Sequence, residues 1–389
     1  MLRLAVVVSL LSSTAIAERA DPKPDPGNEV LLLVNKHRAA SGLPPVVLDA
    51  TLSKGCMEHA NYMLLNKDSD AMVGLNAHKQ DPSLPGASAA GANCGKNADL
   101  FPGVSDLGTA VEGFMSGLYH RRPIMSPDLE KIGVGFAPLP SGGMMAAVMF
   151  VNAKAAKPGW PVGYPGKDQT NVPLEFGNEI PNPIPGGARV GGYPITWQFP
   201  PFDTITDVTA ELTDAAGKPV PFYLSTPEQP ATSFGQYGVI CVIPKALLAA
   251  GAKYSVKLSA NWKAKWSEEK PKHVEQAWSF TTVGLVKVDA ADEAALTAAL
   301  GKPSLVHGKV MWGGMMDANT AFLSFDVGKP TKYELVSVIV PAALWQKLGG
   351  GAEPKTWVDK VLDVEATPHL VMGRYLNLPV AQASQIHVR

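Results

Sequence analysis

The sequence predicts a multidomain α+β protein with an N-terminal α-β-α sandwich, then an antiparallel β-sandwich, then a small β-barrel with a helix. The chain has 389 residues, which is too long for one ordinary domain. Helical spacing of apolar residues dominates its first third and then gives way to short alternating strands. Gly (37 residues) and Pro (34 residues) are abundant, as is typical of β-rich chains with many turns.

The N-terminus has the pattern of an export signal. Arg3 supplies a positive charge, residues 4–11 are apolar, and Ala15-Ile16-Ala17 fits a cleavage site. We therefore expect a cleaved signal peptide over 1–17, a Pro-rich linker over 18–27, and a mature protein that is secreted, periplasmic or attached to the cell envelope. An uncleaved anchor is the alternative. No later run of about 18 apolar residues predicts a transmembrane segment in the mature chain.

The first domain is expected over 28–160. Asn28 is a candidate N-cap for a first helix, and Asp49 is a candidate N-cap for a second. Residues 68–104 are rich in Gly, Asn, Asp and Pro and predict a long loop. A third helix is expected over 105–118, followed by two strands.

Two β-rich domains are expected after it. Residues 161–185 are dense in Pro and Gly and predict a linker. Short alternating runs such as "YGVICVIP" and "YSVKLSAN" predict an antiparallel β-sandwich over 186–284. A helical run and five strands predict a small closed barrel over 285–389.

Two separated segments carry a resemblance to a known family. The segment 33–63, with "NKHR", "GLPP" and "EHA", and the segment 110–137, with "YHRRP" and "IGVGFA", resemble the bacterial secreted branch of the CAP superfamily (cysteine-rich secretory proteins, antigen 5 and pathogenesis-related proteins, also called SCP-like). The resemblance implies an α-β-α sandwich for the first domain. Residues 186–284 resemble a bacterial Ig-like module, and residues 285–389 resemble an oligonucleotide/oligosaccharide-binding (OB) barrel.

The CAP resemblance implies a cleft with two histidines and two acids, in which the histidines of some members bind a divalent metal. His78 and His120 match those histidines, and they are our candidate metal ligands, with zinc as the expected ion. Lys96 stands where the family has its first acid, and a lysine beside a metal site repels the metal. Glu112 is the nearest candidate for the second acid, although its helical spacing turns it toward another face.

The candidate binding cleft therefore comprises His78, His120, Glu112, Lys96 and Arg121, with no confident catalytic residue. His78 could instead be an ordinary surface residue, and His120 could be a structural group that bonds a backbone carbonyl. No cofactor is certain, and zinc is the one cofactor that the two histidines indicate.

The cysteines leave two alternatives open. Cys56 and Cys94 lie in the same expected domain, and export would permit a disulfide between them. All three cysteines could equally be free thiols. Cys241 lies inside an apolar run and is expected to be a buried small side chain.

Composition and missing motifs exclude several functions. The net charge of −1 argues against a nucleic-acid partner, despite the OB-like pattern. The sequence has no G-x-S-x-G, no H-E-x-x-H and no phosphate-binding G-x-x-x-x-G-K-[ST].

Three functions remain, and the sequence favours a binding protein over an enzyme. The first is a secreted or envelope-associated binding or adhesion protein, whose cleft takes a small apolar ligand, a glycan, a cell-surface component or a metal. The second is a metal-dependent hydrolase that uses His78 and His120. The third is a purely structural envelope component.

Overall fold

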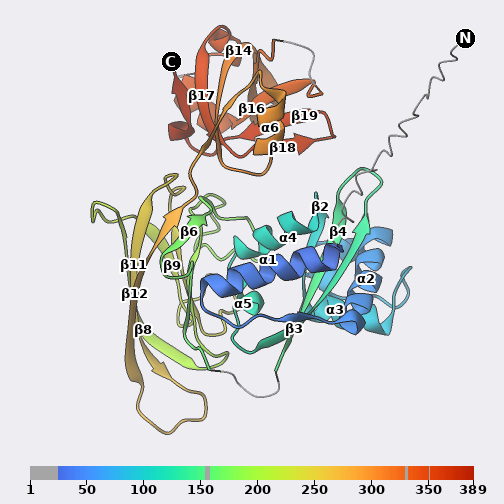
Figure 1. Ribbon diagram of the computed structural model, residues 1–389, viewed down its shortest axis with the longest axis vertical. Helices are drawn as coiled ribbons and strands as arrows, with labels where there is room; N and C mark the ends of the chain where they lie inside the picture. Colours follow the sequence, from blue (N-terminus) through green and yellow to red (C-terminus); the bar gives the residue numbers. More distant parts are fainter. Residues whose placement is uncertain (1–24, 154–157, 329–331, 350) are drawn as a thin grey trace, which may run out of the picture.

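The protein is described here by a computed structural model (Figure 1). The structure describes residues 25–153, 158–328, 332–349 and 351–389. The expected signal peptide over 1–17 and most of the expected linker over 18–27 lie outside the described residues. Within the described part of the chain, no helix has the length and apolar character needed to span a membrane.

The first part of the fold has three layers. Its central sheet has the strand order β1-β3-β4-β2. The strands are β1 (Val47–Leu48), β2 (Ala98–Val104), β3 (Leu129–Pro138) and β4 (Met144–Asn152). The helices are α1 (Pro26–Ala40), α2 (Ala50–Leu65), α3 (Ala89–Asn97), α4 (Leu107–Met115) and α5 (Arg121–Ile124), with two short 3₁₀ turns, η1 (Asp70–Met72) and η2 (Gly74–His78).

Alternation along β4 separates two cores, one on each face of this sheet. Ala146 and Val148 belong to the core that contains α1 and α4. Ala147 and Met149 belong to the core that contains α2 and α3. Gly135 allows α2 to approach the sheet, because a Cβ there would lie 2.0 Å from the backbone carbonyl carbon of Cys56. This is the α-β-α arrangement that the sequence predicts.

The helix starts follow from side-chain caps. The Asp49 carboxylate accepts hydrogen bonds from the amides of Thr51 and Leu52, which confirms the predicted start of α2. The first helix instead begins at Pro26 with Asp25 as its cap, so the prediction for Asn28 was wrong. Residues 68–104 are also not a loop, since they hold η1, η2, α3 and β2.

The second part is a sandwich of two four-stranded sheets, with strand orders β5-β7-β10-β9 and β6-β12-β11-β8. The strands are β5 (Val162–Tyr164), β6 (Gln169–Val172), β7 (Ile195–Gln198), β8 (Thr204–Asp214), β9 (Phe222–Ser225), β10 (Val239–Pro244), β11 (Lys253–Lys263) and β12 (Lys272–Thr282). The segment 161–185 is therefore more than the expected linker, because it supplies one strand to each sheet.

The first two parts share one continuous hydrophobic core. Buried residues of the helical layer, such as Val34 and Phe114, belong to the same cluster as Tyr164 and Trp197 of the sandwich. In Figure 1 the sandwich lies directly beside the α-β-α part, with α1, α4 and α5 close to it. The cleft described below lies at this junction.

The third part has a core of its own. Its described residues form eight strands and two α-helices, which lie at the top of Figure 1. The elements are β13 (Val286–Asp289), α6 (Glu293–Ala299), β14 (Ser304–Asp317), β15 (Thr320–Phe325), β16 (Leu335–Pro341), α7 (Ala342–Gly349), η3 (Pro354–Trp357), β17 (Val361–Ala366), β18 (His369–Val371), β19 (Tyr375–Pro379), η4 (Ala383–Gln385) and β20 (Ile386–Val388). The sheet runs from β18 to β20, and over the described residues these two edge strands do not pair, so the expected closed barrel is an open sheet.

Candidate functional site

A cleft of about 450 Å³ lies where the α-β-α part meets the sandwich. The α-β-α part contributes its polar wall, and the sandwich contributes loops on the opposite side. The lining residues are Leu75, His78, Lys96, Asn97, Ala98, Asp99, Tyr119, His120, Arg122, Pro123, Phe150, Asn152, Ile180, Pro181 and Phe234. The cleft therefore combines several cationic side chains with aromatic and aliphatic walls.

His120 is fixed by a buried carboxylate from outside the α-β-α part. Its ring Nδ1–H donates to Glu179 Oε2 at 2.7 Å, and its ring stacks on Phe114. Glu179 also accepts hydrogen bonds from the backbone amides of Leu118, Tyr119 and His120. Only 4% of the Glu179 side chain is exposed, so this carboxylate is buried, and both of its oxygens accept hydrogen bonds.

The same carboxylate explains a glycine in the sequence. A Cβ on Gly117 would lie 2.5 Å from Glu179 Oε2. Only glycine leaves room for the carboxylate to reach the three amides that follow it. The backbone of the run "SGLYH" thus surrounds the carboxylate of Glu179, which is distant in the sequence.

These contacts keep His120 positively charged. Burial alone would lower the pKa of His120, but the hydrogen bond that it donates to Glu179, the charge of Asp99 once that acid ionises, and the charge of Glu179 outweigh burial and raise the pKa to about 9. His120 is therefore an imidazolium at neutral pH. Its Nε2–H remains as a second, charged donor in the cleft wall.

Asp99 is the second acid of the cleft, at the start of β2. Its Oδ2 is buried without a hydrogen-bond partner among the described residues. Burial raises the pKa of Asp99 to about 8, with a further increase from Glu179 and opposing effects of His120 and Arg122. At neutral pH it is therefore largely a neutral acid, which can donate a hydrogen bond to a ligand.

His78 lies across the cleft in the other protonation state. Its Nδ1–H donates to the carbonyl of Gly95 at 2.9 Å, which leaves Nε2 as an acceptor. Burial lowers the pKa of His78, the bond to Gly95 opposes this, and the charge of His120 lowers it further. The cleft thus holds one neutral and one charged imidazole.

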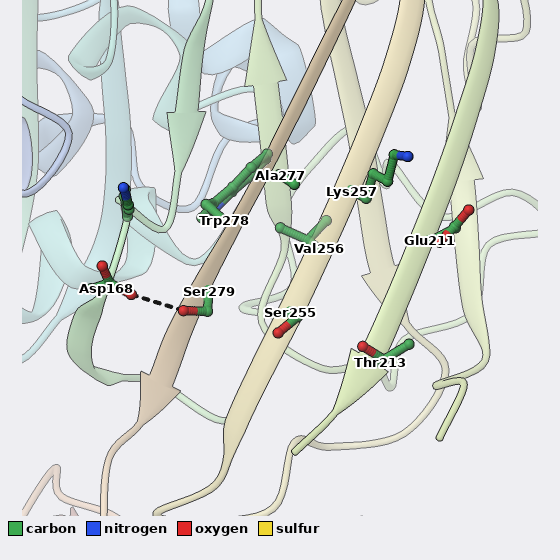
Figure 2. Close-up of a pocket in the computed structure, with 10 residues that line it drawn as sticks. Asp168, Glu211, Thr213, Ser255, Val256, Lys257, Ala277, Trp278 and Ser279 are labelled. Atoms are coloured by element: carbon green, nitrogen blue, oxygen red, sulfur yellow. Dashed lines mark hydrogen bonds between the residues drawn. The ribbon is translucent and has the colours of Figure 1, made fainter. Parts of the chain in front are cut away.

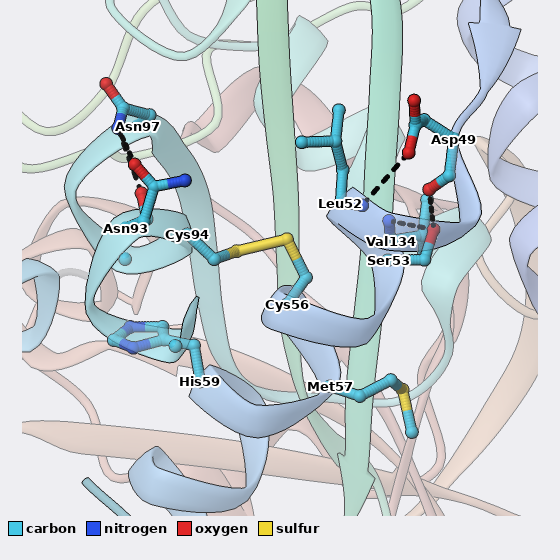
Figure 3. Close-up of a disulfide and its surroundings, with 12 residues drawn as sticks. Asp49, Leu52, Ser53, Cys56, Met57, His59, Asn93, Cys94, Asn97 and Val134 are labelled. Carbon is cyan, nitrogen blue, oxygen red and sulfur yellow. Dashed lines mark hydrogen bonds between the residues drawn. A yellow bond between two sulfur atoms is a disulfide. The ribbon is translucent and has the colours of Figure 1, made fainter. Parts of the chain in front are cut away.

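A disulfide and a packed histidine support this wall (Figure 3). Cys56 of α2 and Cys94 of α3 form the disulfide. Beside it His59 bonds the carbonyl of Ala77 at 3.1 Å and Gln80 at 3.1 Å, and burial lowers its pKa to about 4. His59 is therefore a core residue whose ring nitrogens both have partners, and α3 is held where it places Lys96 at the cleft.

Comparison with known families identifies the first part of the chain. Residues 31–151 match the family model described as CAP, the Cysteine-rich secretory protein family. The chain contains a CAP-like domain. This match ends before Ile180, Pro181 and Phe234, so those cleft residues come from outside the matched segment, as does Glu179, which bonds His120.

The chain is also similar, at low identity, to two solved structures. It matches no curated protein. It is similar to the crystal structure of PcoC, a methionine-rich copper resistance protein from Escherichia coli, with 16% identity, 31% of this chain and 92% of that chain covered, and a TM-score of 0.20. It is also similar to the crystal structure of CopC from Methylosinus trichosporium OB3b, with 13% identity and a TM-score of 0.21. That similarity covers 31% of this chain and 89% of CopC.

Three of the five predicted cleft residues line the cleft of the CAP-like domain, namely His78, Lys96 and His120. The structure places Glu112 elsewhere, because its helical position turns it to His37, whose Nε2 lies 3.1 Å from the carboxylate.

Arg121 also differs from the prediction, because it is a buried structural residue. Only 1% of it is exposed, and its guanidinium donates to the carbonyls of Met115 and Pro194 between the rings of Tyr164 and Tyr193. It joins the CAP-like domain to the sandwich, and its neighbour Arg122 faces the cleft instead.

The metal site stays a prediction. In the described ranges, no group of three or more His, Cys, Asp or Glu side chains is placed to hold a metal ion. The Nδ1 of His120 is occupied by Glu179, and a zinc ligand must be a neutral imidazole. A metal would therefore have to displace the proton that Glu179 and Asp99 stabilise.

A second hollow, of about 430 Å³, lies on the outer sheet of the sandwich (Figure 2). Its floor is formed by side chains of β8, β11 and β12, including Ser255 and Lys257, and its edge by Lys167 and Asp168. The Ser279 hydroxyl donates to Asp168 there at 2.8 Å. No histidine, cysteine or unsatisfied buried acid lines it, so we place the candidate site in the cleft.

The sequence reasoning missed Asp99, Glu179 and Arg122. The one local signal for Asp99 is its place in the strand-like run "NADLF", next to apolar residues. Nothing local distinguishes Glu179, an acid in a Pro-rich segment. Asp99 lines the cleft and Glu179 bonds His120, so the two acids of the site lie at positions other than those of Lys96 and Glu112.

Proposed function

We propose that this chain is an exported binding protein whose cleft takes a saccharide that carries a carboxylate. The observation that carries the proposal is the charged His120, held by Glu179 beside Arg122 in a cleft with aromatic walls. Imidazolium and guanidinium donors bind a carboxylate strongly, and aromatic faces suit the apolar face of a sugar ring. The neutral carboxylic acid of Asp99 suits hydroxyl and amide groups.

The remaining parts of the chain fit the same role. Signal-type residues 1–17 imply export to the periplasm, the cell envelope or the medium. The sandwich and the third part would act as β-rich modules that hold the cleft at a surface. A glycan of the cell envelope is then the natural source of the saccharide.

The test is calorimetric titration of the full chain with the disaccharide of N-acetylglucosamine and N-acetylmuramic acid, which carries one carboxylate. We expect binding that Arg122→Gln weakens by about tenfold or more, since a charge-assisted pair is lost. The matched control is Arg189→Gln, because Arg189 is exposed and lies outside the cleft. Absence of binding in the parent, or an equal loss in the control, would reject the proposal.

Hydrolysis is a second candidate, and Asp99 is the observation that favours it. A carboxylic acid that is still protonated at neutral pH can act as a general acid. Slow cleavage of the glycan that Asp99→Asn abolishes, with binding retained, would establish an enzyme. A metal-dependent version at His78 and His120 would require zinc to restore activity after chelation.

A further inference from the structure

A line of aromatic side chains leads from the cleft along one end of the sandwich. Its ring centroids are 5.1 Å apart for Tyr119–Phe234, 6.1 Å for Phe234–Tyr237 and 5.9 Å for Tyr237–Phe202. The Lys265 ammonium then lies 4.7 Å from the ring of Phe202 and 4.7 Å from that of Trp266. We call these five rings the aromatic track: Tyr119, Phe234, Tyr237, Phe202 and Trp266.

Strand register explains why residues from separate loops form one track. Gln198 at the end of β7 pairs with Val239 at the start of β10. Ile205 at the start of β8 pairs with Trp262 near the end of β11. The β7–β8, β9–β10 and β11–β12 loops therefore gather at one end of the sandwich, the lower end in Figure 1.

The two outer rings of the track are exposed to solvent, whereas Tyr119 at its cleft end is only 7% exposed. Trp266 is 89% exposed and Phe202 is 62% exposed. Phe202, Tyr237 and Trp266 all have left-handed backbone conformations, with φ of 73°, 48° and 69°. Bulky residues rarely adopt this conformation, and it is commonly retained where a function needs it.

Asp203 stabilises this unusual geometry. Its carboxylate accepts hydrogen bonds from the Trp262 indole and from the Lys265 backbone amide, each at 2.8 Å. The turn that carries Phe202 is thereby tied to the loop that carries Trp266. The outer end of the track is thus built by specific contacts.

The charges along the track favour a ligand with few negative charges along its length. Arg122 lies 4.2 Å over the ring of Tyr237, and Lys265 lies between the two outer rings. Asp203 and Asp207 lie at the same end of the sandwich. Two cations with acids beside them are too few for a polyphosphate chain, which binds through many phosphate contacts. They suit a chain with less than one carboxylate per unit.

We propose that the aromatic track extends the cleft into a binding site for a linear acidic polysaccharide, whose sugar rings contact the exposed side chains of Phe234, Phe202 and Trp266. This inference rests on the proposed function, since the saccharide in the cleft is taken as one end of the bound chain. The cleft would bind the carboxylate of the ligand. The track would add affinity that grows with the length of the polysaccharide.

The test compares binding of di-, tetra- and octasaccharides of alternating N-acetylglucosamine and N-acetylmuramic acid to the full chain. We expect the octasaccharide to bind about tenfold or more tighter than the disaccharide. The double variant Phe202→Ala/Trp266→Ala should remove that gain and leave disaccharide binding within about twofold. The control is Trp312→Ala, because Trp312 is also exposed, at 55%, but lies on β14 of the third part.

The outcomes separate the track from the cleft. Equal affinity for all chain lengths, with Arg122→Gln still weakening the disaccharide, would overturn the track and keep the cleft. In another outcome, longer saccharides bind more tightly to the parent and to Arg122→Gln but not to the track variant. That result would support the track and reject the proposed cleft function. Loss of the gain in Trp312→Ala, or no binding of any saccharide, would overturn the track. Tighter binding of an oligothymidylate through the same rings would overturn a polysaccharide as its ligand.

Discussion

Glu179 decides the electrostatics of the cleft. It lies outside the matched CAP segment, yet it holds His120 in its charged form and bonds the backbone on both sides of Tyr119. A histidine with a folded pKa above its unfolded value stabilises the fold fully below about pH 6.5, and this contribution is lost as pH rises through about 9.

Replacing Glu179 by glutamine should therefore lower the pKa of His120 toward an ordinary value of about 6.5. We expect the free energy of unfolding to fall by about 2 kcal/mol at pH 6 and by less at pH 10, where His120 is neutral in both proteins. NMR titration of the His120 ring and denaturant unfolding measure the two effects. The matched control is Glu130→Gln, an exposed acid on β3. An unchanged His120 titration in Glu179→Gln would show that the pair does not set the charge.

Asp99 should have the opposite effect on stability. Because its folded pKa is raised to about 8, the unfolded chain releases this proton near pH 4 while the folded chain keeps it. Stability is therefore lost between about pH 4 and pH 8. We expect Asp99→Asn to raise the free energy of unfolding by about 2 kcal/mol at pH 7.5 and by less at pH 4, measured by urea unfolding. A destabilised variant at pH 7.5 would contradict the raised pKa.

Among the elements, α3 depends on covalent support. It is a nine-residue helix with five small or glycine residues, so it has little apolar surface of its own. The Cys56–Cys94 disulfide attaches it to α2, and α3 in turn positions Lys96 and the carbonyl that orients His78.

The variant Cys56→Ala/Cys94→Ala should lower the free energy of unfolding by about 3 kcal/mol, as expected for a closed loop of this size. It should also weaken saccharide binding, since the wall of the cleft is no longer fixed. A reducing agent should destabilise the parent and leave the double variant unchanged. If reduction destabilises both equally, the disulfide does not support this element.

The elements also show which features the sequence could predict. Asp49 and Asp106 cap their helices through local contacts, so their roles follow from sequence alone. The strands β5 and β6 were missed because they are short and pair with β7 and β12, which lie much later in the chain. Only part of the cleft could be predicted. His78 and His120 follow a family pattern, whereas Glu179 reaches His120 only through the fold of a Pro-rich segment that is distant in the sequence.

At the scale of the molecule, the described residues of the first two parts share a core, and the third part has its own. One core joins the CAP-like domain to the sandwich, and a separate core serves the third part. Arg121, stacked between Tyr164 and Tyr193, lies in the shared core. The cleft at the junction is therefore formed only when both of the first two parts are folded.

Scanning calorimetry of the full chain should show two unfolding transitions. Arg121→Lys should lower the midpoint of one of them by about 5 °C, since lysine cannot reproduce the stacked and forked contacts. The control Arg374→Gln, at an exposed ion pair of the third part, should leave that transition in place. Three separate transitions, or an Arg121→Lys variant that unfolds like the parent, would contradict a shared core.

The most direct test of the central claim is the pH dependence of saccharide affinity in the full chain. Affinity for the acidic disaccharide, measured by calorimetry from pH 6 to pH 10, should fall as Asp99 ionises near pH 8 and His120 loses its proton near pH 9. Both changes remove attraction for a carboxylate, and in Glu179→Gln the decline should move to lower pH. Affinity that stays constant across this range, or a decline that Glu179→Gln leaves in place, would show that the charged His120 does not bind the ligand.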